Sequence, residues 1–185
     1  MGRGAGFTLI ELLITMAVAA ITLGFALPSL LHIMERNHAT VSVNLLIGSI
    51  VYTRHAAIIK RTTVTLCPSL DGALCGGHWH DGTIAFTDHN ADAKLNGEDQ
   101  LLQKFNSPTN GSTIRWRAFR NRQYLQMTQM GFTNFQNGNF VYCSEGRDPR
   151  YSRQIVINVQ GRPRQARDRD GDGIVEDRRG RPLRC

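Results

Sequence analysis

The stretch Phe7–Leu31, FTLIELLITMAVAAITLGFALPSLL, decides how the rest of the chain can be arranged. Its 25 residues carry one charge, that of Glu11. As an α-helix the run is about 37 Å long, which is enough to cross the hydrocarbon core of a bilayer. We therefore predict a membrane-spanning helix here. Pro28 lies inside the run, where a proline removes one backbone hydrogen bond and bends the helix axis.

Glu11 is the unusual residue of this run. An ionised carboxylate inside an apolar span is costly unless it is paired, so it marks a functional site; the alternative is a side chain at the edge of an ordinary anchor helix. A secretory signal peptide has a shorter apolar core with its cleavage site behind it. Here Arg3 supplies a positive front, but the expected processing point, Gly6-Phe7, lies before the apolar run.

The residues Gly6-Phe7-Thr8-Leu9-Ile10-Glu11-Leu12-Leu13 resemble the N-terminus of type IV prepilins and type II secretion pseudopilins. The resemblance implies that residues 1–6 are a leader, that a membrane-bound prepilin peptidase cuts after Gly6, and that the new N-terminus at Phe7 is methylated. It also implies that Glu11 pairs with the α-amino group of Phe7 on a neighbouring subunit. The chain would be a single-pass inner-membrane protein with a periplasmic domain, and would then join a cell-surface pilus.

Helical spacing continues beyond residues 7–31, through residues 32–61. One stripe collects apolar residues and a glycine: Val41, Leu45, Gly48, Tyr52, Ala56 and Ile59. The polar residues Arg36, Asn44 and Arg54 lie off it. We therefore expect an amphipathic continuation of the helix, with this stripe packed against a globular β domain over residues 62–185.

The sequence of residues 62–185 predicts short strands separated by turn residues. The β-branched run Thr63–Cys67 predicts the first strand. Alternation, with Gly, Asn, Pro or Asp between the segments, predicts five more: Thr83–Thr87, Gln100–Phe105, Thr113–Arg117, Gly138–Cys143 and Gln154–Val159. The predicted fold is α+β: a pilin-like long N-terminal α-helix, membrane-spanning in its first half, packed on a C-terminal antiparallel β domain.

Several segments resemble the GspH/FimT family of minor pilins and pseudopilins. Tyr52–Arg61 (YTRHAAIIKR) followed by Val64–Cys67 (VTLC) carries the first part of the likeness. Later segments follow in the same order: Ile114–Phe119 (IRWRAF), Gly138–Cys143 (GNFVYC), Arg153–Asn158 (RQIVIN) and Gly161–Arg164 (GRPR). The resemblance spans nearly the whole chain, and it implies that the partners are other major and minor pilins in a filament.

The four cysteines are Cys67, Cys75, Cys143 and Cys185. A domain exported past the membrane meets an oxidising compartment, so disulfides are expected. Four cysteines allow three pairings, and the sequence alone does not choose among them. We favour Cys67–Cys75 and Cys143–Cys185, since the second pair would tie the C-terminus back to a core strand and close the arginine-rich tail into a loop.

The charge balance favours an anionic partner. The 185 residues carry 22 Lys+Arg against 15 Asp+Glu, a formal net charge of +7. All but three of the 22 are Arg, the planar group suited to phosphate or carboxylate, although GC-rich codon usage would produce the same bias.

The arginines gather in the C-terminal region. In Gly161–Arg164, Gly permits a tight turn and Pro stiffens a loop that carries two guanidinium groups, which suit phosphate oxygens. The Gly-Arg-x-Arg pattern resembles the C-terminal motif of the FimT branch, minor pilins that bind DNA during natural transformation. Arg162 and Arg164 match it directly. The predicted contacts with double-stranded DNA are Arg162, Arg164, Arg167, Arg169, Arg178, Arg179 and Arg181, together with Arg115 and Arg117 from a second basic patch that also contains Arg120 and Arg122. The alternative for this second patch is a strand with solvated arginines on one side and core aromatic residues on the other.

Two function classes follow. In the first, the protein is a minor type IV pilin whose arginines capture extracellular double-stranded DNA without sequence preference, for uptake. In the second, it is structural: a minor pilin that primes pilus assembly, or a type II secretion pseudopilin, with only other pilins as partners. Acids in the same tail favour the second class, because they could pair with the arginines: Asp168, Asp170, Asp172, Glu176 and Asp177.

Two acidic stretches resemble calcium loops. In the first, oxygen ligands stand at positions 1, 3, 5, 9 and 12: Asp88, Asn90, Asp92, Asn96 and Asp99. Position 7 is Lys94, which would offer its carbonyl, but the Gly expected at position 6 is Ala93. The second stretch, Asp168–Gly173, has the front half of such a loop, with Glu176 or Asp177 left to close it. Turns between strands are the favoured interpretation, so no cofactor is expected and calcium is the alternative.

The sequence offers no catalytic constellation. Cys75, His78 and His80 do not supply the four regularly spaced ligands of a structural zinc site. It contains no P-loop, nucleophile elbow or HExxH motif. We therefore expect no enzymatic activity.

Overall fold

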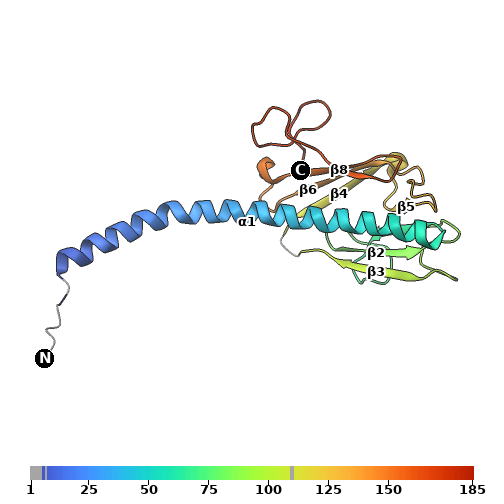
Figure 1. Cartoon of the computed structure of the whole chain (residues 1–185), viewed down its shortest axis with the longest axis horizontal. Coiled ribbons are helices and arrows are strands. Elements are labelled where there is room, and N and C mark those ends of the chain that lie inside the picture. The colour runs from blue at the N-terminus through green and yellow to red at the C-terminus, as the bar shows by residue number, and fades with distance from the viewer. Residues whose placement is uncertain (1–5, 7, 109–110) are drawn as a thin grey trace. The chain divides into compact units, whose positions relative to one another are not determined.

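A long helix opens the fold and short strands follow it. The computed structural model describes residue 6, residues 8–108 and residues 111–185. The helix, α1, spans Leu9–Lys60 (Figure 1). By compactness the chain divides after Asn37, and the later residues form one unit that holds all the strands described here.

The first turn of α1 is capped by Thr8. Its Oγ1 accepts a hydrogen bond from the Glu11 amide at 3.3 Å, and its carbonyl accepts one from the Leu12 amide at 3.2 Å. These contacts satisfy amides that a helix start leaves without partners. Pro28 lies inside α1, and the helix continues past it.

Within the described residues the chain forms eight strands, arranged in two antiparallel sheets. Their bounds are β1 (Val64–Pro68), β2 (Gly82–Thr87), β3 (Leu101–Asn106), β4 (Thr113–Ala118), β5 (Leu125–Met127), β6 (Gly138–Cys143), β7 (Arg153–Ile157) and β8 (Pro163–Gln165). The first sheet has the order β3-β2-β1-β5 and the second has the order β4-β6-β7-β8. A long N-terminal helix packed on antiparallel sheets is the predicted α+β fold, which is thereby confirmed.

The core lies between the last turns of α1 and both sheets. Ile50 of α1 joins Leu66 of the first sheet and Phe140 of the second in one buried cluster. The Phe140 ring stacks on Trp116 with centroids 4.2 Å apart and meets Trp79 edge-on at 4.6 Å. In Figure 1 β2 and β3 lie on one side of this part of α1, and β4, β6 and β8 lie on the other. Burial of Trp116 and Phe140 fixes the inner face of the second sheet.

The buried face of α1 differs from the predicted stripe. The buried residues are Ala39, Ser42, Val43, Leu46, Ser49, Ile50, Thr53 and Ala57. Val41, Leu45 and Ile59, all expected inside, are 42%, 45% and 78% exposed. The predicted stripe contained no serine or threonine, whereas the observed face combines apolar residues such as Leu46 and Ile50 with three of them. The hydroxyls of Ser49 and Thr53 can be buried because they donate to carbonyls of their own helix at 2.8 and 2.7 Å.

Two strands, β5 and β8, are not predicted from the sequence. β5 has three residues, too few for a period-2 pattern to emerge. β8 begins with Pro163, which was expected to stiffen a loop; instead Pro163 pairs with Ile157 at the edge of the second sheet. An edge strand tolerates a proline at its first residue because no ladder donor is lost there. The second arginine of the GRPR segment therefore lies on a strand, and the loop prediction is wrong for it.

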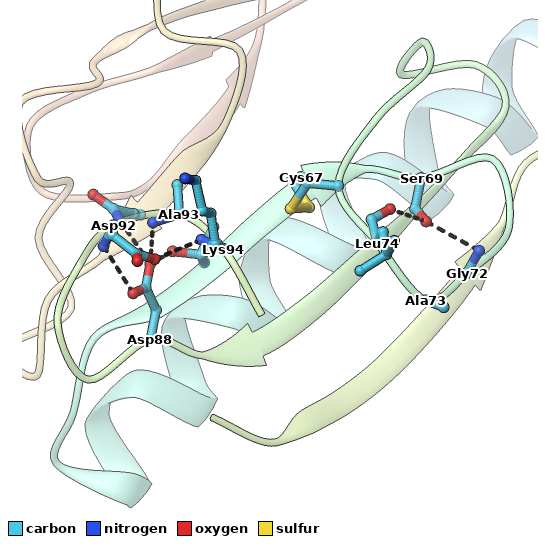
Figure 2. Close-up of a disulfide and its surroundings, with 12 residues drawn as sticks. Cys67, Ser69, Gly72, Ala73, Leu74, Asp88, Asp92, Ala93 and Lys94 are labelled. Carbon is cyan, nitrogen blue, oxygen red and sulfur yellow. Dashed lines mark hydrogen bonds between the residues drawn. A yellow bond between two sulfur atoms is a disulfide. The ribbon is translucent and has the colours of Figure 1, made fainter. Parts of the chain in front are cut away.

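The four cysteines form two disulfides, Cys67–Cys75 and Cys143–Cys185. This is the pairing that the sequence analysis favoured. The first closes the loop after β1 (Figure 2). The second joins the last residue of the chain to the end of β6 and spans 42 residues, so the arginine-rich tail is held at both ends.

Asp88, the residue that follows β2, is the centre of a buried cluster of polar side chains. Its side chain is fully buried, and Oδ2 accepts hydrogen bonds from Thr65 Oγ1 at 2.6 Å, Gln126 Nε2 at 2.8 Å and the Ala93 amide at 3.0 Å. Oδ1 accepts one from the Asp92 amide (Figure 2). Thr65 and Gln126 face each other across β1 and β5, so one carboxylate ties two strands to the loop that follows β2.

Replacing Asp88 by alanine should destabilise the fold strongly. Asp88→Ala leaves buried donors of Thr65, Gln126 and the Ala93 amide without acceptors, and each costs about 1–3 kcal/mol. We expect the free energy of unfolding to fall by about 3 kcal/mol or more. Urea unfolding of the detergent-solubilised chain, followed by fluorescence of the buried Trp79 and Trp116, measures it.

Glu98→Ala is the matched control, since Glu98 is an exposed acid of the same loop. Its effect should stay within about 0.5 kcal/mol of wild type. Equal stabilities for Asp88→Ala and Glu98→Ala would contradict the anchoring role of Asp88.

Candidate functional site

The outward face of the second sheet is set by the alternation along its strands. Trp116 and Phe140 point inward and are buried, as is Ile155. The alternate positions on β4, Arg115 and Arg117, are exposed. Because successive side chains of a strand point to opposite faces, the aromatic core positions fix these two arginines on the outer surface.

A row of paired residues crosses this outer face and ends in an arginine on each side. Arg117 pairs with Asn139, Asn139 with Val156, and Val156 with Arg164. Arg117 and Arg164 therefore lie three strand spacings apart, about 14 Å. The row joins the two basic segments that the sequence analysis treated separately.

The tail after β8 is folded and covers part of this surface. Val175 and Leu183 are buried, and the Leu183 amide donates to the Val175 carbonyl. Glu176 pairs with Pro182 in an isolated bridge. Figure 1 shows the tail, in dark red, as loops on the side of the second sheet away from α1. The Cys143–Cys185 disulfide closes this segment.

Eight of the nine predicted arginines line two neighbouring hollows on this face. The first hollow lies between β4 and the tail and is lined by Arg115, Arg117, Arg178, Arg179 and Arg181. The second lies beside β8 and is lined by Arg164, Arg167, Arg169 and Arg178. Gln154, Val156 and Arg178 line both. We call this combined surface the arginine face. The floor residues Gln154 and Val156 were not singled out from sequence, although their alternation along β7 carried the signal.

Arg162, the ninth arginine, is exposed in the turn before β8 and lines neither hollow. Gly161 makes that turn possible: its φ is +69°, and a Cβ there would stand 2.6 Å from the Gly131 carbonyl oxygen. Arg54 of α1 holds the same region, because its Nε donates to the carbonyls of Gly131 and Gln160 at 3.0 and 3.3 Å. Sequence spacing had placed Arg54 off the packed stripe.

Most arginines of the arginine face carry no internal ion pair. Within the described residues, Arg181 alone among the nine predicted arginines forms one, with its Nη2 3.0 Å from Asp177 Oδ2. The Arg181 amide, followed by the Arg179 amide, lowers the pKa of the Asp177 carboxyl. A guanidinium nitrogen of Arg115 donates to the Arg184 carbonyl. The expectation that tail acids pair with tail arginines thus holds for one pair.

The other arginines of the second basic patch lie elsewhere. Arg120 and Arg122 line a different hollow, beside Tyr124 and Phe135. The Arg122 guanidinium lies 5.6 Å from the Tyr124 ring centroid, and its Nη1 donates to the Tyr124 hydroxyl at 2.5 Å. Arg115 and Arg117 therefore contribute to the arginine face without their two neighbours.

In the first acidic loop, residues 88–99, the carboxylates accept hydrogen bonds from protein N–H and O–H groups. Both oxygens of Asp88 accept hydrogen bonds from the protein. Asp92 accepts from the Asn96 side chain and the Lys94 amide, which lower the pKa of its carboxyl. His89 donates to Asp99 through its amide. Calcium at this loop, with Asn90 among its ligands, remains a prediction.

The second acidic loop brings four carboxylates together. One oxygen from each of Asp168, Asp170, Asp172 and Glu176 lies within 4.8 Å of the others. The Gly171 amide, followed by the Gly173 amide, lowers the pKa of the Asp168 carboxyl. Glu176, one of the two closing residues considered from sequence, is the one that joins this cluster.

The N-terminal candidates are only partly described. Gly6 is exposed, and Glu11 is exposed in the first turn of α1; Phe7 lies outside the described residues. The helix is long and apolar enough to cross a membrane. A carboxylate in a first helical turn is favoured by the positive end of the helix dipole.

Two family models match the chain. One, described as type II transport protein GspH, matches residues 42–161. The other, described as a prokaryotic N-terminal methylation motif, matches residues 1–27. No curated protein sequence gives a significant match.

Three solved structures are similar. Two are crystal forms of the type IV minor pilin FimU of Pseudomonas aeruginosa. The first has a TM-score of 0.56 and 19% identity over 71% of this chain and 90% of FimU; the second has 0.53 and 17% over 69% and 92%. The third, the minor pseudopilin EpsH from the type 2 secretion system of Vibrio cholerae, has 0.49 and 9% over 69% and 95%.

The family match fits the fold and the helix that opens it. Its members are structural pilins and pseudopilins and not enzymes, and they assemble with other pilins after processing by a prepilin peptidase. The expected pilin fold is confirmed by its likeness to FimU. The chain therefore belongs to the GspH family of type II transport proteins and carries the N-terminal methylation motif of pilins and pseudopilins.

Proposed function

We propose that this protein is a minor type IV pilin that binds extracellular double-stranded DNA without sequence preference, for uptake in natural transformation. The arginine face is the observation that supports the proposal. The GspH match ends at Gly161. It therefore gives no information about the function of the tail, which begins at Arg162. The chemistry of these arginine side chains is therefore what supports DNA binding.

The spacing of the arginines suits a duplex. Arg117 and Arg164 lie about 14 Å apart across the second sheet. The major groove of B-DNA is about 12 Å wide, so guanidinium groups at this spacing can reach phosphates on both of its edges. Arg178, shared by the two hollows, lies on the same surface. Guanidinium groups bind phosphate oxygens through charge-assisted, often bidentate hydrogen bonds.

The contacts would not read sequence. Phosphate contacts position a protein on DNA without distinguishing bases. The nine arginines are exposed, and all but Arg181 are without ion pairs among the described residues. Binding through them releases counterions, so affinity must fall steeply with salt. Capture of DNA from any source requires this kind of recognition.

The N-terminal segment would carry the protein to the cell surface. In this proposal a prepilin peptidase removes residues 1–6, and residues 7–31 hold the chain in the inner membrane with residues 62–185 in the periplasm. Assembly with major and minor pilins then moves it into a pilus. Glu11 would pair with the α-amino group of Phe7 on the neighbouring subunit, because an unpaired carboxylate in this apolar surrounding is costly.

A structural role without DNA is the second candidate. The GspH match and the methylation motif favour it, because they are satisfied by a minor pilin that primes assembly or by a type II secretion pseudopilin. The two candidates differ in what the arginine face does and agree on the N-terminal segment.

The DNA proposal predicts a salt-dependent affinity that depends on the GRPR arginines. In mobility-shift assays, the detergent-solubilised chain should bind two duplexes of unrelated sequence equally and weaken steeply between 50 and 200 mM salt, on the order of that seen for several phosphate contacts. Arg162→Gln/Arg164→Gln should weaken binding about tenfold or more and reduce the log–log salt slope by about 2.

Lys60→Gln/Lys104→Gln is the matched control. It removes the same charge from exposed positions on α1 and β3, outside the arginine face. It should bind DNA nearly as well as wild type. Absence of binding at low salt, or equal losses in the two double variants, would reject the DNA proposal and leave the structural one.

Glu11 should be needed for assembly and not for membrane insertion. Glu11→Gln keeps the size of the side chain and removes the charge that would attract a neighbouring α-amino group. We expect unchanged membrane fractionation and loss of the chain from purified filaments, measured by immunoblotting. A Thr22→Ser variant, altered inside the same apolar run, is the control. Normal incorporation of Glu11→Gln would contradict the pairing.

A further inference from the structure

Four carboxylates converge in the loop that follows β8. The cluster consists of Asp168, Asp170, Asp172 and Glu176, with one oxygen of each within 4.8 Å of the rest. Asp170 and Asp172 are exposed, Asp168 is half-buried and Glu176 is 8% exposed. Like charges at this separation repel one another, and a cation bound among them would relieve that repulsion.

Glu176 has a buried carboxylate oxygen that also points to a missing ligand. Its Oε2 accepts a hydrogen bond from the Arg169 amide at 3.2 Å, but its buried Oε1 has no hydrogen-bond partner among the residues that the structure describes. Buried polar atoms are nearly always partnered, and an unpartnered carboxylate oxygen is among the most costly exceptions. This oxygen belongs to a side chain of the cluster, where a ligand could supply the missing partner.

Arginine side chains do not supply the missing charge. Arg167, Arg169 and Arg178 line the same hollow as Asp168 and Glu176. Even so, across residues 8–108 and 111–185, none of the four clustered acids forms an ion pair; the nearby Asp177 is the tail acid that pairs, with Arg181. Within the described residues, therefore, no arginine side chain compensates the charge of these carboxylates through an ion pair.

The order of the residues matches a calcium loop shortened at its end. Asp168, Asp170 and Asp172 stand at positions 1, 3 and 5, and Gly173 stands at position 6 with a φ of +88°, which suits the sharp turn required there. Position 12 is Arg179, an exposed cation that cannot be a ligand. Glu176, at position 9, is the acid that joins the other three.

We propose that Asp168, Asp170, Asp172 and Glu176 form a calcium-binding site in the C-terminal tail. The donors are all hard oxygens, which favour Ca²⁺ over thiolate- or imidazole-binding metals, and Ca²⁺ accepts irregular coordination geometry whereas Mg²⁺ demands a near-ideal octahedron. Bound calcium would fix the tail between β8 and the Cys143–Cys185 disulfide. This site does not rest on the proposed DNA binding.

Isothermal titration of the chelator-treated, detergent-solubilised full chain with CaCl₂ tests the proposal. We expect one calcium per chain, with a dissociation constant on the order of 10⁻⁴ M, as in extracellular calcium modules, and weaker binding of MgCl₂. Asp170→Asn/Asp172→Asn alters two exposed ligands and should weaken calcium binding at least about tenfold. Glu176→Gln, of nearly the same shape, should also weaken it.

Asp92→Asn/Asp99→Asn is the control that separates this site from the first acidic loop, and it should leave calcium binding unchanged. Trypsin gives a second readout: calcium should slow cleavage after Arg169 and Arg178 in wild type and not in Asp170→Asn/Asp172→Asn. The proposal is overturned if wild type does not bind calcium, if the tail variants bind it normally, or if the loop control alone loses it.

Discussion

The stacking of Trp116 on Phe140, at 4.2 Å, is the contact on which the surface of this protein depends. The two rings come from neighbouring strands and are paired in register, so their burial fixes both strands at once. A slip of one residue would turn every side chain of a strand to the opposite face. With the rings inside, Arg115 and Arg117 must lie outside. The core thereby determines where the positive charge of β4 is presented.

The same logic extends to the tail through covalent and backbone constraints. Gly161 is needed where it stands, because its φ is positive and a Cβ would meet the Gly131 carbonyl. It brings β8 against β7, which places Arg164 at the edge of the arginine face. The Cys143–Cys185 disulfide then returns the chain to the end of β6. A long basic segment that would otherwise cost much conformational entropy to hold against the sheet is thus held at both ends.

The sequence predicts the parts that depend on strong local patterns. The helix, the pilin-like fold and the strand Gly138–Cys143 follow from apolar length, motif and alternation. The packed face of α1 is mispredicted because buried hydroxyls such as Ser49 are satisfied within the helix, which hydrophobic spacing does not register. β8 is not predicted because a proline is typical of a loop, and its pairing with Ile157 of β7 is visible only in the structure. The presence of Arg117 and Arg164 on the same face of one sheet depends on strand order, which cannot be predicted from any local pattern.

If the outer face of the second sheet and the tail form one anion-binding surface, as proposed, a DNA duplex should contact both. The most direct measurement is amide NMR of the labelled chain in detergent during titration with a short DNA duplex. The account predicts chemical-shift changes that cluster at Arg117, Asn139 and Arg164 and leave β2 and β3 unaffected. Changes confined to the first sheet, or none at low salt, would contradict it.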